Sequence, residues 1–286
     1  RWNLVTGVQT CALPIYPWAN VGAVRSKGFD GNFQYKDHLG NVNWTIRGNI
    51  TYNKNTILER DEENNVYPYQ YEKGYRIGQQ RGLIDLGLFK DYNDIRNSPK
   101  QIWGKVQPGD IKYKDINGDG VIDNGDRVAI GATNIPNLIY GLGASFSWKG
   151  FDFNFHFQGA GKYTFRLSGK TVYAFSEGRW GNILKDMTNN RWISADISGS
   201  KETENINATY PRLSYGTNHN NQQPSTFWLR DGRYLRLKNI DIGYSLPKQL
   251  LSSLHLENVR FYISGQNLIT WSSFKLWDPE LGSSEG

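Results

Sequence analysis

One segment of the sequence carries the residue types and the spacing of a calcium-binding loop. Oxygen-bearing side chains recur from Asp115 onward at loop positions one, three, five, nine and twelve, and Gly120 stands at position six. Calcium requires hard oxygens that converge on one point, and the glycine permits the sharp turn between them. The predicted ligands, one through its backbone carbonyl, are Asp115, Asn117, Asp119, Val121, Asp123 and Asp126.

The residues around this loop leave two interpretations open. Asp126 stands where an EF-hand has Glu, and the alternation over residues 111–114 together with Gly118 argues against flanking helices. The sequence therefore predicts a calcium-type loop outside an EF-hand. The alternative is a loop rich in Asx turns, whose carboxylates accept backbone N–H groups and hold no metal. Calcium is the only cofactor that the sequence suggests.

Catalytic patterns are not found. The four His residues are scattered without metal-ligand spacing. The segment GAGKYT at residues 159–164 lacks the first glycine of a phosphate-binding loop, because His156 stands at that position. No G-x-S-x-G nucleophile elbow occurs, and the pair Glu62 and Glu63 lies in a charged segment typical of a solvated loop. We therefore expect no enzyme and assign no catalytic residue.

Three Trp residues in polar segments are candidates for binding a solute. Trp180, Trp192 and Trp228 could stack on sugar rings, as exposed aromatic rings do in carbohydrate sites. The alternative is that these rings pack inside folded loops.

A β-hairpin over residues 137–158 is the clearest element that could position these loops. A two-residue turn at Lys149 and Gly150 fixes its register, so that Phe146 faces Phe153 and Ala144 faces Phe155. One face is then apolar throughout, while the other carries polar side chains or glycine. Strands of about ten residues with one lipid-facing and one lumen-facing side are typical of outer-membrane barrels.

The same division of faces recurs elsewhere in the chain. A turn at Leu39 and Gly40 would pair Tyr35 with Trp44 and Phe33 with Ile46. Further on, the alternation of apolar residues changes from odd to even positions within residues 236–246, and a bulge near Lys238 and Asn239 would keep these residues on one face. Residues 247–255 predict a short turn with a helix. The strand that follows would direct its apolar residues to lipid, namely Val259, Phe261 and Ile263.

Composition agrees with a barrel and excludes other classes. The chain has 286 residues, a mean hydropathy of −0.62 and 38% hydrophobic residues, so no run is long enough for a membrane-spanning helix. Its net charge of +6 is dispersed without a basic block, which argues against nucleic-acid binding. The single cysteine, Cys11, excludes a disulfide within the chain. A secreted, β-rich carbohydrate-binding module with a calcium-stiffened loop remains the alternative.

Four segments in combination resemble the SusC/RagA family of TonB-dependent outer-membrane transporters. They are PGDIKYKDINGDGVIDNGDR, PNLIYGLGASFSWKGFDFNFHFQGAGK, FWLRDGRYLRLKNIDIGYSLP and LENVRFYISGQNLITWSSFKLWDPE. The resemblance implies an all-β fold that is part of a large antiparallel barrel in the outer membrane of a Gram-negative, Bacteroidota-type bacterium. It also implies a SusD-like surface lipoprotein as partner, energy from the TonB complex, contact with membrane lipid, and import of glycans or peptides.

The predicted organisation has two parts. Residues 1–15 resemble translated sequencing adapter and are expected to be non-native, while residues 16–286 form a partial barrel without its plug and last strand. About eight to ten strands are expected, against 22 in a plugged transporter. Because short turns of bacterial barrels face the periplasm, residues 54–135 should hold an even number of crossings or none, with the calcium-type loop in an extracellular excursion. Residues 161–226 should be extracellular, with a short helix within residues 175–189.

Overall fold

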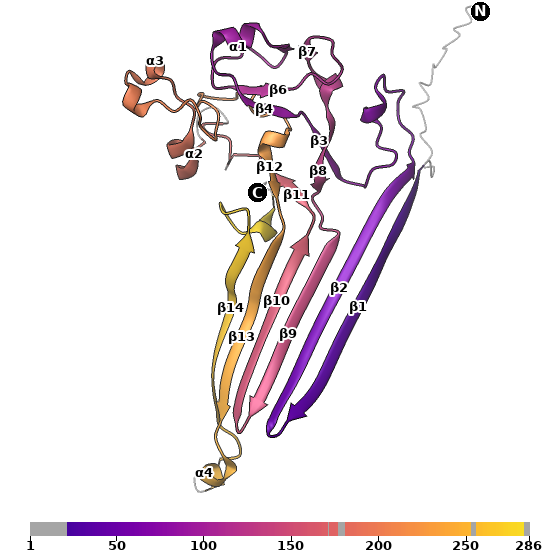
Figure 1. The fold of residues 1–286 in the computed structure, drawn as a ribbon, viewed down its shortest axis with the longest axis vertical. Helices are drawn as coiled ribbons and strands as arrows, with labels where there is room; N and C mark the ends of the chain where they lie inside the picture. The colour runs from indigo at the N-terminus through magenta and orange to yellow at the C-terminus, as the bar shows by residue number, and fades with distance from the viewer. Residues whose placement is uncertain (1–21, 171, 177–180, 253–255, 283–286) are drawn as a thin grey trace, which may run out of the picture.

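The computed structural model shows a long, inclined antiparallel sheet with a unit of irregular loops at one end (Figure 1). The structure describes residues 22–170, 172–176, 181–252 and 256–282. The predicted non-native segment, residues 1–15, lies outside this part of the chain, and so do Trp180 and His255.

Six strands form the sheet in the order β1-β2-β9-β10-β13-β14, each antiparallel to its neighbours. Because β2 pairs directly with β9, the chain between them adds no strand to this sheet among the described residues. The prediction of eight to ten strands therefore exceeds the six found here, since shorter apolar runs pair within the loops instead. The strand bounds are Ala23–Leu39 for β1, Val42–Glu59 for β2, Leu138–Trp148 for β9, Phe151–Gly161 for β10, Tyr234–Ser245 for β13 and Arg260–Ser272 for β14.

The loop unit consists of short elements that pair with one another above the sheet (Figure 1). Its two-stranded pairs are β3 with β8, β4 with β6, β5 with β7 and β11 with β12, and only the β5–β7 pair is parallel. The strand bounds are Gln79–Gly82 for β3, Asp85–Leu88 for β4, Lys100–Gln101 for β5, Ile111–Tyr113 for β6, Val121–Ile122 for β7, Val128–Thr133 for β8, Thr164–Arg166 for β11 and Leu229–Asp231 for β12.

Helices in the described part of the chain are short. In the loop unit, α2 (Lys185–Asn190) lies mostly within the range predicted to contain a helix, and α4 (Lys248–Ser252) lies at the opposite end of the sheet, as predicted for residues 247–255. No helix among the described residues is both long and apolar enough to cross a bilayer. The other helical bounds are Tyr92–Arg96 for α1, Ala195–Ser198 for α3, Pro68–Gln70 for η1, Asn124–Asp126 for η2, Lys201–Thr203 for η3, Thr226–Trp228 for η4 and Pro279–Leu281 for η5.

The hydrophobic core lies mainly in the loop unit and not between layers of the sheet. Loop residues from β4 to η4 and the segment after β14 bury their apolar side chains against one another. One face of the sheet is apolar, and we call it the outer face. Most apolar side chains on this face stay exposed or half-exposed. Buried members of the core include Leu83, Ile111, Tyr113, Ile122, Phe165, Leu167, Trp228 and Phe274.

The β9–β10 hairpin has the register that the sequence predicts. Phe146 pairs with Phe153, and Ala144 pairs with Phe155. Lys149 and Gly150 both have positive φ, 46° and 88°, as a type I′ turn requires.

The β1–β2 hairpin corrects the predicted register by two residues. Its turn is Gly40 and Asn41, and Tyr35 pairs with Ile46 where Trp44 was predicted. Gly40 has φ of 61°, which suits the first position of a two-residue turn followed by Asn. Because side chains alternate with a period of two, the shift leaves every residue on its predicted face.

The predicted bulge in β13 is confirmed. Leu237 pairs with Phe157 and Asn239 pairs with His156, so Lys238 is the extra residue between them. The bulge restores the alternation along β13, which would otherwise place Ile240 and Ile242 on the polar face.

Candidate functional site

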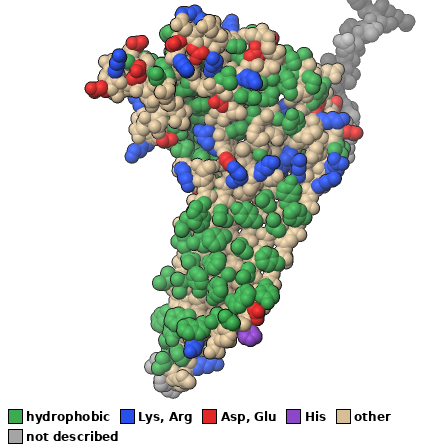
Figure 2. Space-filling view, viewed as in Figure 1, with side chains coloured by type: hydrophobic (Ala, Val, Ile, Leu, Met, Phe, Trp, Pro, Cys, Tyr) green, Lys and Arg blue, Asp and Glu red, His purple; other side chains and the backbone are tan. Residues whose placement is uncertain are grey.

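The outer face of the sheet is a broad apolar surface that no described part of the chain covers (Figure 2). Figure 2 shows hydrophobic side chains over nearly the whole length of the strands. Ile263 on β14, a predicted lipid-facing residue, is 79% exposed. Contiguous apolar surface of this extent marks a face that meets lipid or another protein. Exposed members are Phe29, Phe33, Tyr35, Ile46, Ile50, Leu142, Phe146, Trp148, Phe151, Ile242, Phe261 and Ile263.

The opposite face of the same strands is polar and hydrogen-bonded across the sheet. Asn154 on β10 accepts a hydrogen bond from Arg47 at 2.9 Å and donates one to Asp241 at 3.3 Å. Closer to the turns, Arg260 forms an ion pair with Asp152. Charged side chains that bridge strands in this way suit a water-filled lumen, because they would be costly on a lipid-facing surface.

At the loop end of the polar face, Arg236 holds the segment that follows β14. Its guanidinium is almost fully buried and forms ion pairs with Asp278 and Glu280, while its Nε donates to Thr270 at 3.0 Å. Tyr234 also donates to Glu280, at 2.5 Å. Burial would raise the pKa of Asp278, but hydrogen bonds from the Glu280 N–H and Arg236 hold it below its ordinary value. These contacts hold residues 278–280 against the loop end of β13 and β14.

Inside the loop unit, Asp110 joins segments that lie about a hundred residues apart in sequence. Its buried carboxylate lies 2.8 Å from the Nε of Arg212 and accepts hydrogen bonds from the side chains of Asn218 and Asn221. The Gln107 N–H donates to the same carboxylate. Since a buried charge is costly unless it is paired, these contacts hold the two long loops together as one unit.

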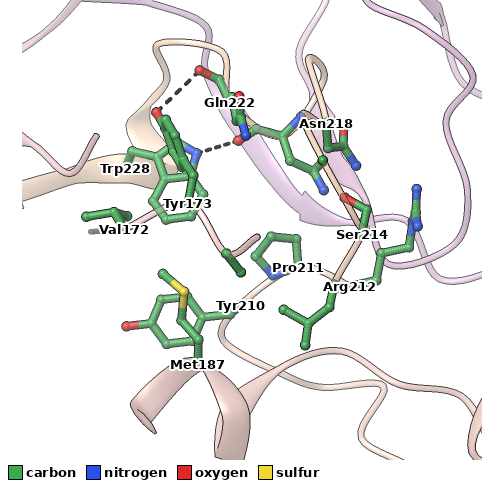
Figure 3. Close-up of a pocket in the computed structure, with 14 residues that line it drawn as sticks. Val172, Tyr173, Met187, Tyr210, Pro211, Arg212, Ser214, Asn218, Gln222 and Trp228 are labelled. Carbon is green, nitrogen blue, oxygen red and sulfur yellow. Dashed lines mark hydrogen bonds between the residues drawn. The ribbon is translucent and has the colours of Figure 1, made fainter. Parts of the chain in front are cut away.

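A small pocket lies between these loops (Figure 3). Met187 of α2, Tyr210, Pro211 and Trp228 line it, and the indole N–H of Trp228 donates to the Asn221 carbonyl at 2.6 Å. Its free space is about 40 Å³, which holds a few water molecules but not a sugar ring or a peptide residue. This pocket is a feature of loop packing.

A larger hollow lies between α2, β12 and the segment after β14. It measures about 570 Å³, within the range of sites for small ligands. Its walls combine aromatic rings with charged groups of both signs. Tyr210 donates to Asp186 at 2.8 Å, and burial together with this hydrogen bond raises the pKa of Tyr210 to about 12. Other lining side chains are Asp85, Phe227, Arg230, Asp231, Phe274 and Lys275.

In the predicted calcium loop, the oxygens face backbone amides. Asp115 accepts from the N–H groups of Gly118 and Gly120, and Asp119 accepts from Val121. Asn117 and Asp123 accept in the same manner from Asp119 and Gly125.

Asp126, at the last position of the loop, is fully buried. It accepts from the N–H groups of Ile116 and Asp123 at 2.7 and 2.9 Å. No three Asp, Glu, His or Cys side chains of the described chain lie together as a metal site would need. The geometry matches the Asx-turn alternative, and calcium binding stays a prediction.

The Trp residues predicted to stack on sugars are buried where the structure describes them. Trp192 and Trp228 are each 3% exposed, and the Trp192 ring packs directly over Gly109. Neither ring offers a free face to a solute in this arrangement, which matches the alternative of packing within folded loops. Sequence reasoning missed Arg236 and Asp110. The available signal for Arg236 was a charge flanked by Leu235 and Leu237.

Comparisons with known proteins agree with this geometry. No model of a protein family matches the chain. TonB-dependent receptor P26 of Formosa agariphila is 29% identical to it, with 93% of this chain and 26% of the relative covered. TonB-dependent receptor SusC of Bacteroides thetaiotaomicron is 24% identical, with 92% and 25% covered. The chain thus spans about a quarter of the length of these relatives, which are named as receptors and not as enzymes.

Solved structures show the same fold. The RagAB peptide transporter superposes with a TM-score of 0.65 at 19% identity, over 92% of this chain and 27% of that one. The RagAB peptide importer in its closed-closed state gives 0.62 at 22% identity, with 92% and 28% covered. The predicted relationship to SusC/RagA-type TonB-dependent receptors is therefore confirmed, and the six-stranded sheet is part of a large antiparallel barrel wall.

Proposed function

We propose that this chain is part of the wall and the extracellular loops of an outer-membrane importer for oligomeric nutrients, either glycans or peptides. The apolar outer face of the sheet would contact lipid, and the polar inner face would line the import path. The intact protein would draw energy from the TonB complex and work with a SusD-like surface lipoprotein. The membrane would be the outer membrane of a Bacteroidota-type bacterium.

One observation carries this proposal: the six long strands expose an apolar face on one side and a hydrogen-bonded polar face on the other. A soluble sheet would bury the apolar face against a second layer. In a barrel wall, lipid covers that face and water fills the other side. The relatives support the same function, since both curated ones are TonB-dependent receptors and the RagAB structures are of a peptide importer.

The loop unit supports a role in solute contact. Its fixed core and the hollow beside Arg230 and Asp231 lie at the end of the sheet opposite the short turns. Because short turns face the periplasm in bacterial barrels, this end faces the medium. The aromatic rings and charges of both signs around the hollow could bind either sugar rings or peptide groups.

The test uses the intact parent gene in its host. Deletion should abolish growth on one oligomeric nutrient and leave growth on its monomer unchanged, and loss of TonB should have the same effect. The protein should also fractionate with the outer membrane and co-purify with a surface lipoprotein. Normal import of every tested glycan and peptide by the deletion strain would refute the proposal.

The alternative, a secreted carbohydrate-binding module, is not supported by the exposed apolar face. Such a module must remain in solution, where an uncovered apolar surface over six strands would drive aggregation. Recovery of the intact protein from the medium in a detergent-free, monomeric state would favour this alternative.

A further inference from the structure

Positive side chains form a band directly above the apolar face of the sheet (Figure 2). At its β1–β2 end, Arg25, Lys27 and Lys54 are all exposed and line one hollow of about 410 Å³ together with Phe29 and Tyr52. We name these three residues the rim cation cluster. The rings of Phe29 and Tyr52 stack at 5.7 Å and close the cluster on the side of the apolar face.

The strand register brings these charges together. Lys27 and Lys54 are direct cross-strand partners, and Arg25 lies two residues further along β1 on the same face. Like charges placed directly opposite each other in a sheet are destabilising. An anion bound between the two strands would offset this repulsion.

No protein carboxylate of the described chain supplies that anion. Arg25, Lys27 and Lys54 form no ion pair with a described residue. Asp30, three residues from Lys27, lies on the opposite face of β1 and accepts a hydrogen bond from Thr51. A second hollow shares Lys54 and Tyr52 and adds Arg76 and Lys162. The Nε of Arg76 is buried there without a hydrogen-bond partner.

The position of the cluster along the strands matches the level of lipid headgroups. The apolar face runs along β1 from Leu39 at the turn to Phe29, ten residues further up. At about 3.3 Å per residue and a strand tilt of about 40°, this span covers about 25 Å of membrane thickness, the height of the apolar band in outer-membrane barrels. Lys27 and Arg25 then lie roughly 5 and 10 Å above the hydrocarbon boundary.

We propose that the rim cation cluster binds the phosphate group of a phosphorylated lipid in the outer leaflet, whose acyl chains lie along the apolar face below it. The inference rests on the outer-membrane location given under Proposed function. The charges lie on a face of the sheet and not on its hydrogen-bonding edge, so a further strand beside β1 would leave them accessible. Binding of this kind would anchor a specific lipid against the wall on the extracellular side.

The experiment uses the intact parent protein in nanodiscs of zwitterionic lipid. A labelled phosphorylated glycolipid is titrated in, and the same glycolipid after phosphatase treatment serves as the comparison ligand. A triple variant, Arg25→Gln, Lys27→Gln and Lys54→Gln, removes the cluster. The control variant, Lys36→Gln, Lys149→Gln and Lys248→Gln, makes the same change in net charge at the turn end of the sheet.

Wild type and the control variant should bind the phosphorylated glycolipid equally. The triple variant should bind it roughly 150-fold more weakly, since each positive side chain near a membrane surface contributes about 1 kcal/mol, a factor of about five. Dephosphorylated glycolipid should bind to all three proteins as weakly as the phosphorylated form binds to the triple variant.

Equal binding of the phosphorylated glycolipid by wild type and the triple variant would overturn the inference, and so would equal binding of both glycolipids by wild type. Binding of inorganic phosphate alone as tightly as the phosphorylated glycolipid would show a site for free phosphate and also overturn it. The lipid-binding measurements do not depend on the import assays. Failure of the lipid site and failure of the proposed import function can therefore be distinguished.

Discussion

Replacing Phe155 with Arg tests the assignment of the two faces most directly. On β2, the apolar face extends from Val42 beside the turn to Tyr52, so its midpoint lies within one residue of Ile46. Ile46 pairs with Ala144, and Ala144 pairs with Phe155. Phe155 is therefore at the centre of the apolar band, within about 3 Å along the strand.

The expected cost of this change depends on depth. Arg on the lipid face near the midplane destabilises a barrel by about 2–4 kcal/mol, and by about 0–1 kcal/mol near the interfaces. Phe155→Arg should therefore cost about 2–4 kcal/mol, and it also removes the ring contacts to Phe153 and Phe157. Phe151→Arg, next to the turn, should cost less than about 1 kcal/mol.

The matched control is the neighbouring residue on the polar face. An Arg in place of Asn154 loses the acceptor for Arg47, but it keeps Asp241 as a carboxylate partner and remains in the lumen, where water screens the two positive charges. Its cost should stay below about 1 kcal/mol. The assay is equilibrium guanidinium unfolding of the intact parent in lipid vesicles. Equal costs for Phe155→Arg and Asn154→Arg would refute the assigned faces, and equal costs for Phe155→Arg and Phe151→Arg would refute the assigned depth.

Four further predictions concern the loops and a turn. If residues 115–126 bind calcium, Asp115→Ala or Asp119→Ala should abolish calcium-dependent protection of residues 114–127 from protease; wild-type protection that ignores a chelator would leave the loop as a turn. Arg236→Ala should destabilise the packing of residues 278–280 by about 2 kcal/mol, measured by hydrogen exchange, and unchanged exchange would contradict this role. Because Asp278 has a lowered pKa, its contribution should be complete above pH about 4 and disappear as the pH falls through the lower folded value. The protection factor of this segment, corrected for the pH dependence of intrinsic amide exchange, should therefore fall from pH 7 to pH 3 more in wild type than in Asp278→Asn. Lys149→Asn should stabilise the β9–β10 hairpin by up to about 1 kcal/mol, because Asn tolerates the positive φ better; a loss of thermal stability would show that the Lys149 contact with the Trp148 ring matters more.

The sheet was largely predictable because two separate signals specify it. Alternation gives the face of each residue, and turn chemistry gives the register. In β9 and β10 both signals agreed, and the predicted pairs are those in the structure. In β1 and β2 the alternation alone allowed two registers with identical faces, and the choice of Leu39 and Gly40 as the turn selected the wrong one. The Gly40-Asn41 pair was the decisive signal.

The loop unit was less predictable because its contacts are distant in sequence. Asp110 is held by residues about a hundred positions later, and Arg236 by Asp278 and Glu280 more than forty positions later. Neither set of contacts follows a periodicity or a spacing that can be recognised in a single sequence. The short strands β4 and β6 pair across a shorter separation, Asp85 with Tyr113 and Leu88 with Ile111, but no turn signal links them. Their apolar residues could therefore be recognised as strand-forming without a known partner.

The segment predicted to bind calcium shows why spacing alone could not separate a cation site from a turn. Asp and Asn are suited to both roles for the same reason, since their short side chains place an oxygen near the backbone. What distinguishes the two is how many N–H groups each oxygen already accepts. Asp126 is buried and accepts at both oxygens, so turning it toward a cation would leave buried donors unpaired at a cost of about 1–3 kcal/mol each. Asp115 and Asp119 accept from amides that remain exposed to water, where release costs less. A cation would therefore bind first through Asp115 and Asp119, and Asp119→Ala should weaken calcium binding more than Asp126→Asn does.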